Sequence, residues 1–203
     1  MKKLPPKNST AKEKPGSLRI ISGAWRGRSI EVLPGKSVRP TSDRVREALF
    51  NRLAHSFADE GFRLSGARVV DVFAGTGALG LEALSRGAAQ AVLLDRNPDV
   101  IGLLKRNVGK LGAEDRTTIM NADGAHLPRA ATACDLAFLD PPYGEGLAMS
   151  GLNSLANQNW LSSGALVTVE TDASETLADA AGYVLLDRRS YGRVAITFLK
   201  YVG

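Results

Sequence analysis

Residues 69–80 read VVDVFAGTGALG, an apolar, strand-like run followed by a turn that contains three glycines. The residues that follow, up to Gly87, space leucines and alanines as in a helix. This stretch therefore predicts a strand, a glycine turn and a helix. Glycines let the backbone turn tightly and approach a ligand, and the start of the helix presents free N–H groups and a positive dipole end.

The spacing Gly75-x-Gly77-x-x-Gly80 fits the dinucleotide-binding pattern. A different ligand on a Rossmann-like first turn, or a tight turn without any ligand, would also account for it. Asp71 stands just before the turn. Its carboxylate would repel a pyrophosphate, so it favours a ligand with a cationic or amine group.

The composition is that of a folded protein with an ordinary core, since 44% of its 203 residues are hydrophobic. This length predicts one domain, with room for a small appendage. The single cysteine, Cys134, excludes an internal disulfide framework and fits a reducing compartment. No apolar run approaches the roughly 20 residues that span a bilayer, and the basic N-terminus lacks the apolar core of a secretory signal. We expect a cytoplasmic monomer that makes no membrane contact.

Positive charge is concentrated at the N-terminal end. Residues 1–55 contain 13 Lys and Arg against four Asp and Glu, whereas the rest contains 13 against 17. A basic segment on an acidic-leaning body predicts contact with a polyanion. Residues 1–17 lack periodicity and are predicted to be a disordered basic tail. A solubilising tail would explain the lysines there, but not the arginines that follow Arg19.

Residues 18–58 are predicted to form an RNA-facing hairpin and helix, ahead of a main domain at 59–203. The hairpin covers 18–33, and the helix starts near Ser42 with Val45, Leu49 and Leu53 on its apolar face. An aromatic residue among arginines suits phosphate contacts and base stacking on RNA, although a solvated basic face would look the same. The candidate RNA-binding residues are Trp25, Arg26, Arg28, Arg39, Thr41, Arg44 and Arg46.

Strands and helical segments alternate from residue 67 onward, which predicts an α/β fold. The predicted strands cover 67–73, 89–96, 115–123, 134–144 and 165–171, with a closing hairpin at 184–201 and an amphipathic helix at 97–112. This alternation predicts a Rossmann-like parallel sheet with helices on both faces and ligands at the carboxyl ends of its strands. Four acids fall at such ends: Asp71, Asp95, Asp123 and Asp140.

Asp95 ends the second strand, where Rossmann-like proteins place an acid that receives ribose hydroxyls. A surface acid beside Arg96 is the alternative. Asp123 is a candidate acceptor for an adenine amine or a simple loop cap. The two histidines and one cysteine form no cluster in the sequence, so we expect no metal site.

Residues 140–143 read DPPY at the end of a buried-looking strand. Two consecutive prolines fix the backbone and leave carbonyl groups free to accept hydrogen bonds. This set suits a planar ring that bears an exocyclic amine. Tyr143 would stack on the ring, while Asp140 and the Pro141 carbonyl accept the amine hydrogens. The amine lone pair would then point at an electrophile held by the glycine turn.

The stretches RIISGAWRGRSI, RPTSDRVREALFN, DVFAGTGALGLEALSRGA and LDPPY, in this order, resemble the bacterial 16S rRNA guanine-N2 methyltransferases. The resemblance covers nearly all of residues 18–203. It implies a seven-stranded methyltransferase sheet whose last strand is antiparallel. It also implies S-adenosylmethionine as cofactor and a guanine of 16S rRNA, in the 30S subunit, as target.

Carried onto this chain, the resemblance places the cofactor's methionine part at residues 74–77, its ribose at Asp95 and its adenine at Asp123. The target base falls at residues 140–143. The candidate cofactor-binding residues are Asp71, Phe73, Ala74, Gly75, Thr76, Gly77, Asp95, Arg96, Asp123 and Gly124, and the candidate catalytic residues are Asp140, Pro141, Pro142 and Tyr143.

Two other functions remain open at this point. DPPY also occurs in N6-adenine DNA methyltransferases, although this chain has no insertion large enough for a domain that reads duplex sequence. A non-catalytic RNA-binding assembly factor could also use this fold, since fold alone does not decide function.

Overall fold

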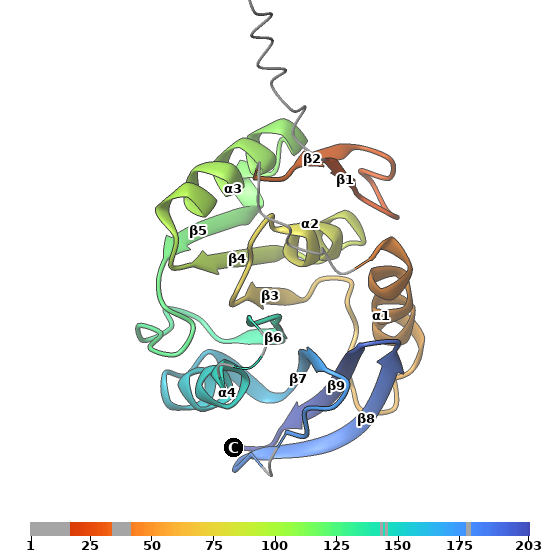
Figure 1. The fold of residues 1–203 in the computed structure, drawn as a ribbon, viewed down its shortest axis with the longest axis vertical. Helices are drawn as coiled ribbons and strands as arrows, with labels where there is room; N and C mark the ends of the chain where they lie inside the picture. Colours follow the sequence, from red (N-terminus) through yellow and green to blue (C-terminus); the bar gives the residue numbers. More distant parts are fainter. Residues whose placement is uncertain (1–16, 34–41, 143, 145, 178–179) are drawn as a thin grey trace, which may run out of the picture.

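A central seven-stranded sheet organises the computed structural model, which describes residues 17–33, 42–142, 144, 146–177 and 180–203 (Figure 1). The strand order is β5-β4-β3-β6-β7-β9-β8. The strands are β3 (Arg68–Asp71), β4 (Gln90–Asp95), β5 (Thr117–Asn121), β6 (Cys134–Leu139), β7 (Leu161–Asp172), β8 (Tyr183–Tyr191) and β9 (Val194–Tyr201). All seven correspond to predicted strands, and β7 begins four residues before the predicted start.

Strands β5, β4, β3, β6 and β7 pair in parallel, whereas β9 pairs antiparallel with β7 and β8. The α/β class, the Rossmann-like parallel sheet and the antiparallel last strand are therefore confirmed. The parallel strands end together at one edge of the sheet, because neighbouring parallel strands run in the same direction.

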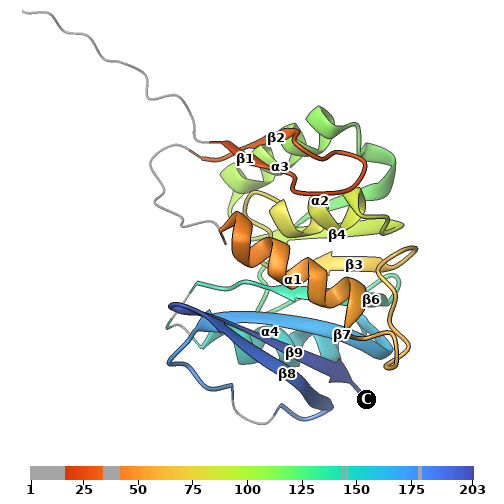
Figure 2. The same ribbon diagram turned by 90° about the vertical axis from the view of Figure 1, so that its right-hand side faces the viewer.

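Side chains from successive strand residues enter two apolar cores on opposite faces of the sheet. Val69 belongs to the core that includes residues of α1 (Asp43–His55), α2 (Ala78–Ser85) and α3 (Pro98–Leu111). Val70 belongs to the other core, with residues of α4 (Leu147–Asn157). Helices thus cover both faces, as predicted, and Figure 2 shows α1 crossing in front of the sheet. A short 3-10 helix, η1 (Glu114–Arg116), precedes β5.

The ends of α1 and α3 follow from their capping residues. The Ser42 side chain accepts a hydrogen bond from the Val45 N–H at the start of α1. Asn97 caps α3 by accepting from the Asp99 N–H. Gly112 closes α3 in the left-handed conformation, with φ 66°. Helix α3 begins and ends within one residue of the predicted limits, and α1 begins one residue after Ser42, as predicted.

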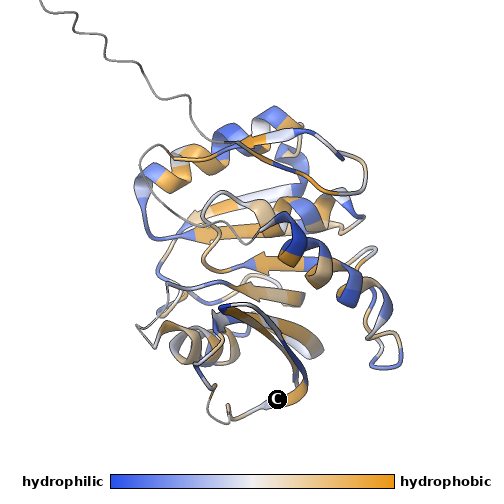
Figure 3. Ribbon diagram, turned by 45° about the vertical axis from the view of Figure 1, so that its right-hand side comes forward, coloured by the Kyte–Doolittle hydropathy of each residue, from blue (hydrophilic) through white to orange (hydrophobic). Residues whose placement is uncertain are grey.

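The N-terminal hairpin consists of β1 (Ser17–Arg19) and β2 (Ser29–Glu31), which pair antiparallel. The predicted hairpin is confirmed, with three residues in each strand. Its apolar residues Ile20, Trp25 and Ile30 are buried in the same core as α1, α2 and α3. Figure 3 shows the hydrophobic central strands beneath helices of mixed polarity. None of the helices in the described ranges is long and apolar enough to cross a membrane.

Candidate active site

The glycine turn between β3 and α2 has the geometry that its sequence predicts. Gly77 caps α2 with φ 79°, a left-handed conformation that side chains other than glycine rarely adopt. A Cβ atom at Gly80 would lie 2.3 Å from Leu93 Cδ2, so any larger residue there would force Leu93 or α2 to shift. The turn is thus held tightly against the sheet.

Asp71, the last residue of β3, is hydrogen-bonded to the start of α2. Its Oδ2 accepts a hydrogen bond from the Gly80 N–H at 3.0 Å, and the residue is only 1% exposed. Burial raises the pKa of the Asp71 carboxyl to about 7, partly offset by this hydrogen bond. Asp71 does not line the neighbouring cavity. The expectation that it faces a cationic ligand is corrected: its carboxylate positions the start of α2.

A cavity of about 980 Å³ lies at the carboxyl ends of the parallel strands, a volume suited to a small-molecule ligand. One part is lined by residues that follow β3, β4 and β5: Phe73, Gly75, Thr76, Asp95, Arg96, Asn97, Val100, Leu103 and Gly124. The opposite part is lined by Asp140, Pro141, Pro142, Leu147, Glu170, Asp172, Tyr191, Arg193 and Val194. Val32, Leu33, Ser42 and Val45 complete the lining from the N-terminal region.

The Asp95 carboxylate holds two backbone segments of the cavity together. Its Oδ2 accepts from the Gly75 N–H at 3.2 Å, and its Oδ1 accepts from the Asn97 N–H at 2.8 Å. Asp95 thereby joins the glycine turn to the start of α3. The structure places this acid at the end of β4, within the cavity lining, where sequence reasoning expected a ribose acceptor.

Most of the candidate cofactor-binding and catalytic residues meet in this cavity, namely Phe73, Gly75, Thr76, Asp95, Arg96, Gly124, Asp140, Pro141 and Pro142. Ala74 and Gly77 are buried behind the lining. Asp123 also lies outside the lining; its Oδ1 accepts from the Ala125 N–H, which lowers the pKa of the Asp123 carboxyl. Tyr143 falls outside the described residues. Within the described ranges, no three or more His, Cys, Asp and Glu side chains group so as to hold a metal ion.

Sequence reasoning missed several of the cavity residues, among them Glu170, Tyr191 and Arg193. Glu170 could have been found, because it lies near the carboxyl end of β7 as Asp95 lies at the end of β4. Tyr191 and Arg193 flank the tight β8–β9 connection. That connection reaches the cavity only because β9 pairs antiparallel with β7, which places Val194 opposite Asp172.

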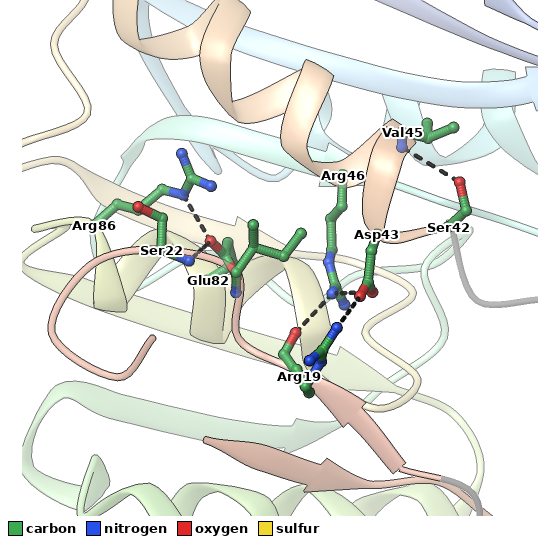
Figure 4. A network of polar contacts seen from close by, with 9 residues as sticks. Arg19, Ser22, Ser42, Asp43, Val45, Arg46, Glu82 and Arg86 are labelled. Carbon is green, nitrogen blue, oxygen red and sulfur yellow. Dashed lines mark hydrogen bonds and ion pairs between the residues drawn. The ribbon is translucent and has the colours of Figure 1, made fainter. Parts of the chain in front are cut away.

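The N-terminal hairpin is fastened to α2 by a buried carboxylate (Figure 4). Glu82, which is fully buried, accepts from the Ile21 N–H at 2.7 Å and the Ser22 N–H at 3.0 Å. It also pairs with Arg86 Nε at 2.7 Å. Ser85 adds a second link, since its hydroxyl donates to the Ser22 carbonyl. The hairpin is therefore anchored next to the glycine turn's helix.

Two of the candidate RNA-binding residues are buried, and their predicted contact with RNA is wrong. Trp25 is packed in the core, with the Arg116 guanidinium 5.0 Å from its ring centroid. Arg46 is 1% exposed and donates to the Arg19 carbonyl and the Asp43 carboxylate (Figure 4). Trp25 is held in the interior by packing against apolar side chains, and Arg46 by its hydrogen bonds and its ion pair.

The remaining candidates keep accessible side chains where the structure describes them. Arg26 and Arg44 are exposed. Arg28 is exposed as well, but its guanidinium donates to the carbonyls of Lys110 and Leu111 at the end of α3. Arg39 and Thr41 lie outside the described residues.

The parallel sheet with antiparallel β9, the glycine turn after β3 and the Asp-Pro-Pro sequence after β6 together define an α/β methyltransferase. Solved structures agree. The Escherichia coli protein named "Putative methyltransferase yhhF" superimposes with a TM-score of 0.80 and 35% identity, over 93% of this chain and 99% of that one.

The chain belongs to the ribosomal RNA small subunit methyltransferase D family, and the family described as "Conserved hypothetical protein 95" matches residues 18–200. It is 39% identical to ribosomal RNA small subunit methyltransferase D of Escherichia coli strain K12, over 89% of this chain and 88% of the relative. The protein of that name from Haemophilus influenzae is 36% identical, over 89% of this chain and 92% of the relative. The predicted family membership is therefore confirmed.

Proposed function

We propose that this chain transfers a methyl group from S-adenosylmethionine to the exocyclic N2 amine of a guanine in 16S rRNA. One observation carries the proposal: a single cavity joins the glycine turn and Asp95 on one side to Asp140, Pro141 and Pro142 on the other. The names of the relatives, which are ribosomal RNA small subunit methyltransferases, support an rRNA substrate.

The residues of the first part fit S-adenosylmethionine. The turn at Gly75, which lines the cavity, allows close approach of a ligand to the backbone. Asp95 would accept hydrogen bonds from the ribose hydroxyls. Gly124 lines the cavity where the adenine would lie, and a Cβ there would come within 2.5 Å of the Phe73 ring. When bound, this cofactor supplies an electrophilic methyl group on a sulfonium.

The residues of the second part fit a planar base with an amine. Asp140 and the carbonyl of Pro141 would accept the two amine hydrogens, so that the nitrogen lone pair points out of the ring plane. The Asp140 carboxylate can also take the proton that the amine releases on methylation. Tyr143, outside the described residues, is the proposed stacking partner.

The RNA would approach from the N-terminal side. Arg26 and Arg44 offer exposed guanidinium groups for phosphates. Arg28, Arg39 and Thr41 remain proposed contacts. We further propose that the protein acts as a monomer in the cytoplasm, on the assembling or assembled small subunit.

Tritiated methyl transfer to small subunits from a strain that lacks this gene tests the function. The labelled RNA is digested and its nucleosides are separated. We expect label in N2-methylguanosine. Label in N6-methyladenosine would show that the site is catalytic but the proposed base is wrong, and cofactor binding without any label would overturn the proposed reaction.

The Asp140→Asn variant adds a test of the active-site assignment. Loss of its negative charge should lower the rate by about 100-fold or more, because charge-assisted acceptors stabilise the developing positive charge on the amine. Asp59→Asn is the matched control, since Asp59 is exposed and lies outside the cavity lining. An Asp140→Asn enzyme as active as this control would contradict the role of Asp140.

A further inference from the structure

Glu170 lies in the part of the cavity that we assign to the target base. It belongs to β7, is 7% exposed and lines the cavity. Leu139 of β6 pairs in register with Val169 of β7. Asp140 comes directly after Leu139 and Glu170 directly after Val169. The two acids therefore lie side by side on neighbouring parallel strands, whose backbones are about 4.8 Å apart.

The other acid on this wall, Asp172, lies nearer the surface at the carboxyl end of β7. Asp172 Oδ1 accepts from both the Ser174 N–H, at 3.0 Å, and the Ser174 hydroxyl, at 2.6 Å. These hydrogen bonds lower the pKa of the Asp172 carboxyl. Asp172 is the last residue of β7, whereas Glu170 lies two residues earlier in the strand and is more deeply buried. Glu170 is the buried acid nearest in register to Asp140.

Two adjacent carboxylates distinguish guanine from other bases with an exocyclic amine. Next to its N2 amine, guanine presents a second donor, the N1–H group. Adenine and cytosine present a ring nitrogen with a lone pair beside their amine. A carboxylate has only acceptor atoms, so it attracts the first arrangement and repels the second.

We propose that Glu170 selects guanine by accepting a hydrogen bond from N1–H, while Asp140 and the Pro141 carbonyl accept from the N2 amine. This inference rests on the proposed function and names the residue that would determine its base specificity. Burial strengthens the selection, because a buried acceptor that faces a lone pair loses its hydrogen bond and is not compensated by water.

The test uses an analogue that keeps the target amine but lacks the N1–H group. Once the methylated nucleotide has been mapped, 2-aminopurine is introduced there by ligation of a synthetic RNA fragment, and the subunit is reconstituted. The wild-type enzyme should prefer guanine over 2-aminopurine by about 100-fold or more in kcat/KM. In Glu170→Gln, the amide N–H group can donate to the analogue's N1, so the preference should fall to about tenfold or less.

The comparison between variants isolates position 170. 2-Aminopurine also lacks O6, and this loss lowers the rates of the wild-type enzyme and of Glu170→Gln alike. Only the difference in guanine preference between the two enzymes therefore reports on Glu170. Glu175→Gln is the matched control: it removes the same charge five residues away, outside the cavity lining, and should keep the wild-type preference. Binding of S-adenosylhomocysteine to each variant verifies an intact fold.

The possible failures can be told apart. Wild-type enzyme that labels no guanine refutes the proposed function, and the inference with it. Wild-type enzyme that labels guanine while Glu170→Gln keeps the full preference overturns the inference alone. If Glu170→Gln does not fold, Glu170→Ala replaces it: removal of the acceptor should lower the guanine preference below that of the wild-type enzyme, and an unchanged preference overturns the role of Glu170. Wild-type methylation of 2-aminopurine within about tenfold of guanine also overturns it.

Discussion

The side-chain amide of Asn107 in α3 donates a hydrogen bond to the carbonyl oxygen of Thr76 in the glycine turn, at 2.9 Å. The same amide pairs with both backbone groups of Glu31 in β2, at 2.7 Å and 3.1 Å. Asn107 is fully buried. One side chain therefore couples the N-terminal hairpin, α3 and the cofactor side of the cavity.

Asn107→Ala should weaken both the fold and the cofactor site. It leaves part-buried backbone groups of Glu31 and Thr76 without this partner, which costs about 2–4 kcal/mol in free energy of unfolding. Affinity for S-adenosylhomocysteine should fall by about tenfold, or ~1.4 kcal/mol, because the glycine turn loses a support. Urea denaturation and calorimetry measure the two effects. Asn153→Ala, on the exposed face of α4, is the control, and equal losses in both variants would contradict the coupling.

Gly80→Ala should destabilise the protein although alanine is the better helix former. Its Cβ would lie 2.3 Å from Leu93 Cδ2, so the buried Leu93 side chain or α2 must shift, at a cost of about 1–3 kcal/mol. Gly102→Ala in α3 is the matched control. Its Cβ would meet only Arg106 Nη1, at 3.6 Å, and it should gain about 0.5–1 kcal/mol. Thermal unfolding measures both, and a stabilised Gly80→Ala would refute the packing argument.

Asp71→Asn should change how stability depends on pH. Burial raises the pKa of Asp71 from 3.8 to about 7, so between these values the folded protein holds a proton that the unfolded chain releases. Wild-type stability therefore falls as pH rises through this window. From pH 5 to pH 8 the variant should gain roughly 2–3 kcal/mol relative to wild type. Urea denaturation at each pH measures this, with Asp59→Asn as the control for loss of one carboxylate. Parallel curves for wild type and Asp71→Asn would contradict the shift.

Charge reversal at Arg26 and Arg44 should weaken RNA binding selectively. The double variant should raise the KM for RNA by roughly tenfold and make the salt dependence of binding shallower, since each lost phosphate contact removes about 0.7–0.9 from the slope. Cofactor affinity should stay as in wild type. Arg63→Glu, at another exposed position, is the control. A similar KM increase in the control would show that overall charge, rather than this surface, attracts RNA.

The sequence predicts the limits of a helix correctly where the residues that start and end the helix lie within that same stretch. Helix α3 carries its own cap, its own N-terminal proline and its own closing glycine, so residues 97–112 predict its limits. Helix α4 was not predicted as a separate element, because it begins at a glycine without a side-chain cap and contains Gly151. Gly151 fits there for a tertiary reason: a Cβ would lie 2.7 Å from Leu139 Cδ2.

The sequence by itself determined the α/β class, the glycine turn and nine of the residues that line the cavity, because the carboxyl ends of parallel strands always meet at one edge. Only the tertiary structure decided which arginines are available and which acids line the cavity. Arg46 and Arg44 are two residues apart in α1, yet one is buried and the other exposed. Packing against the hairpin and α2 makes that difference, and residues distant in sequence provide it. The same holds for Glu170, which becomes a neighbour of Asp140 only through the register of β6 and β7.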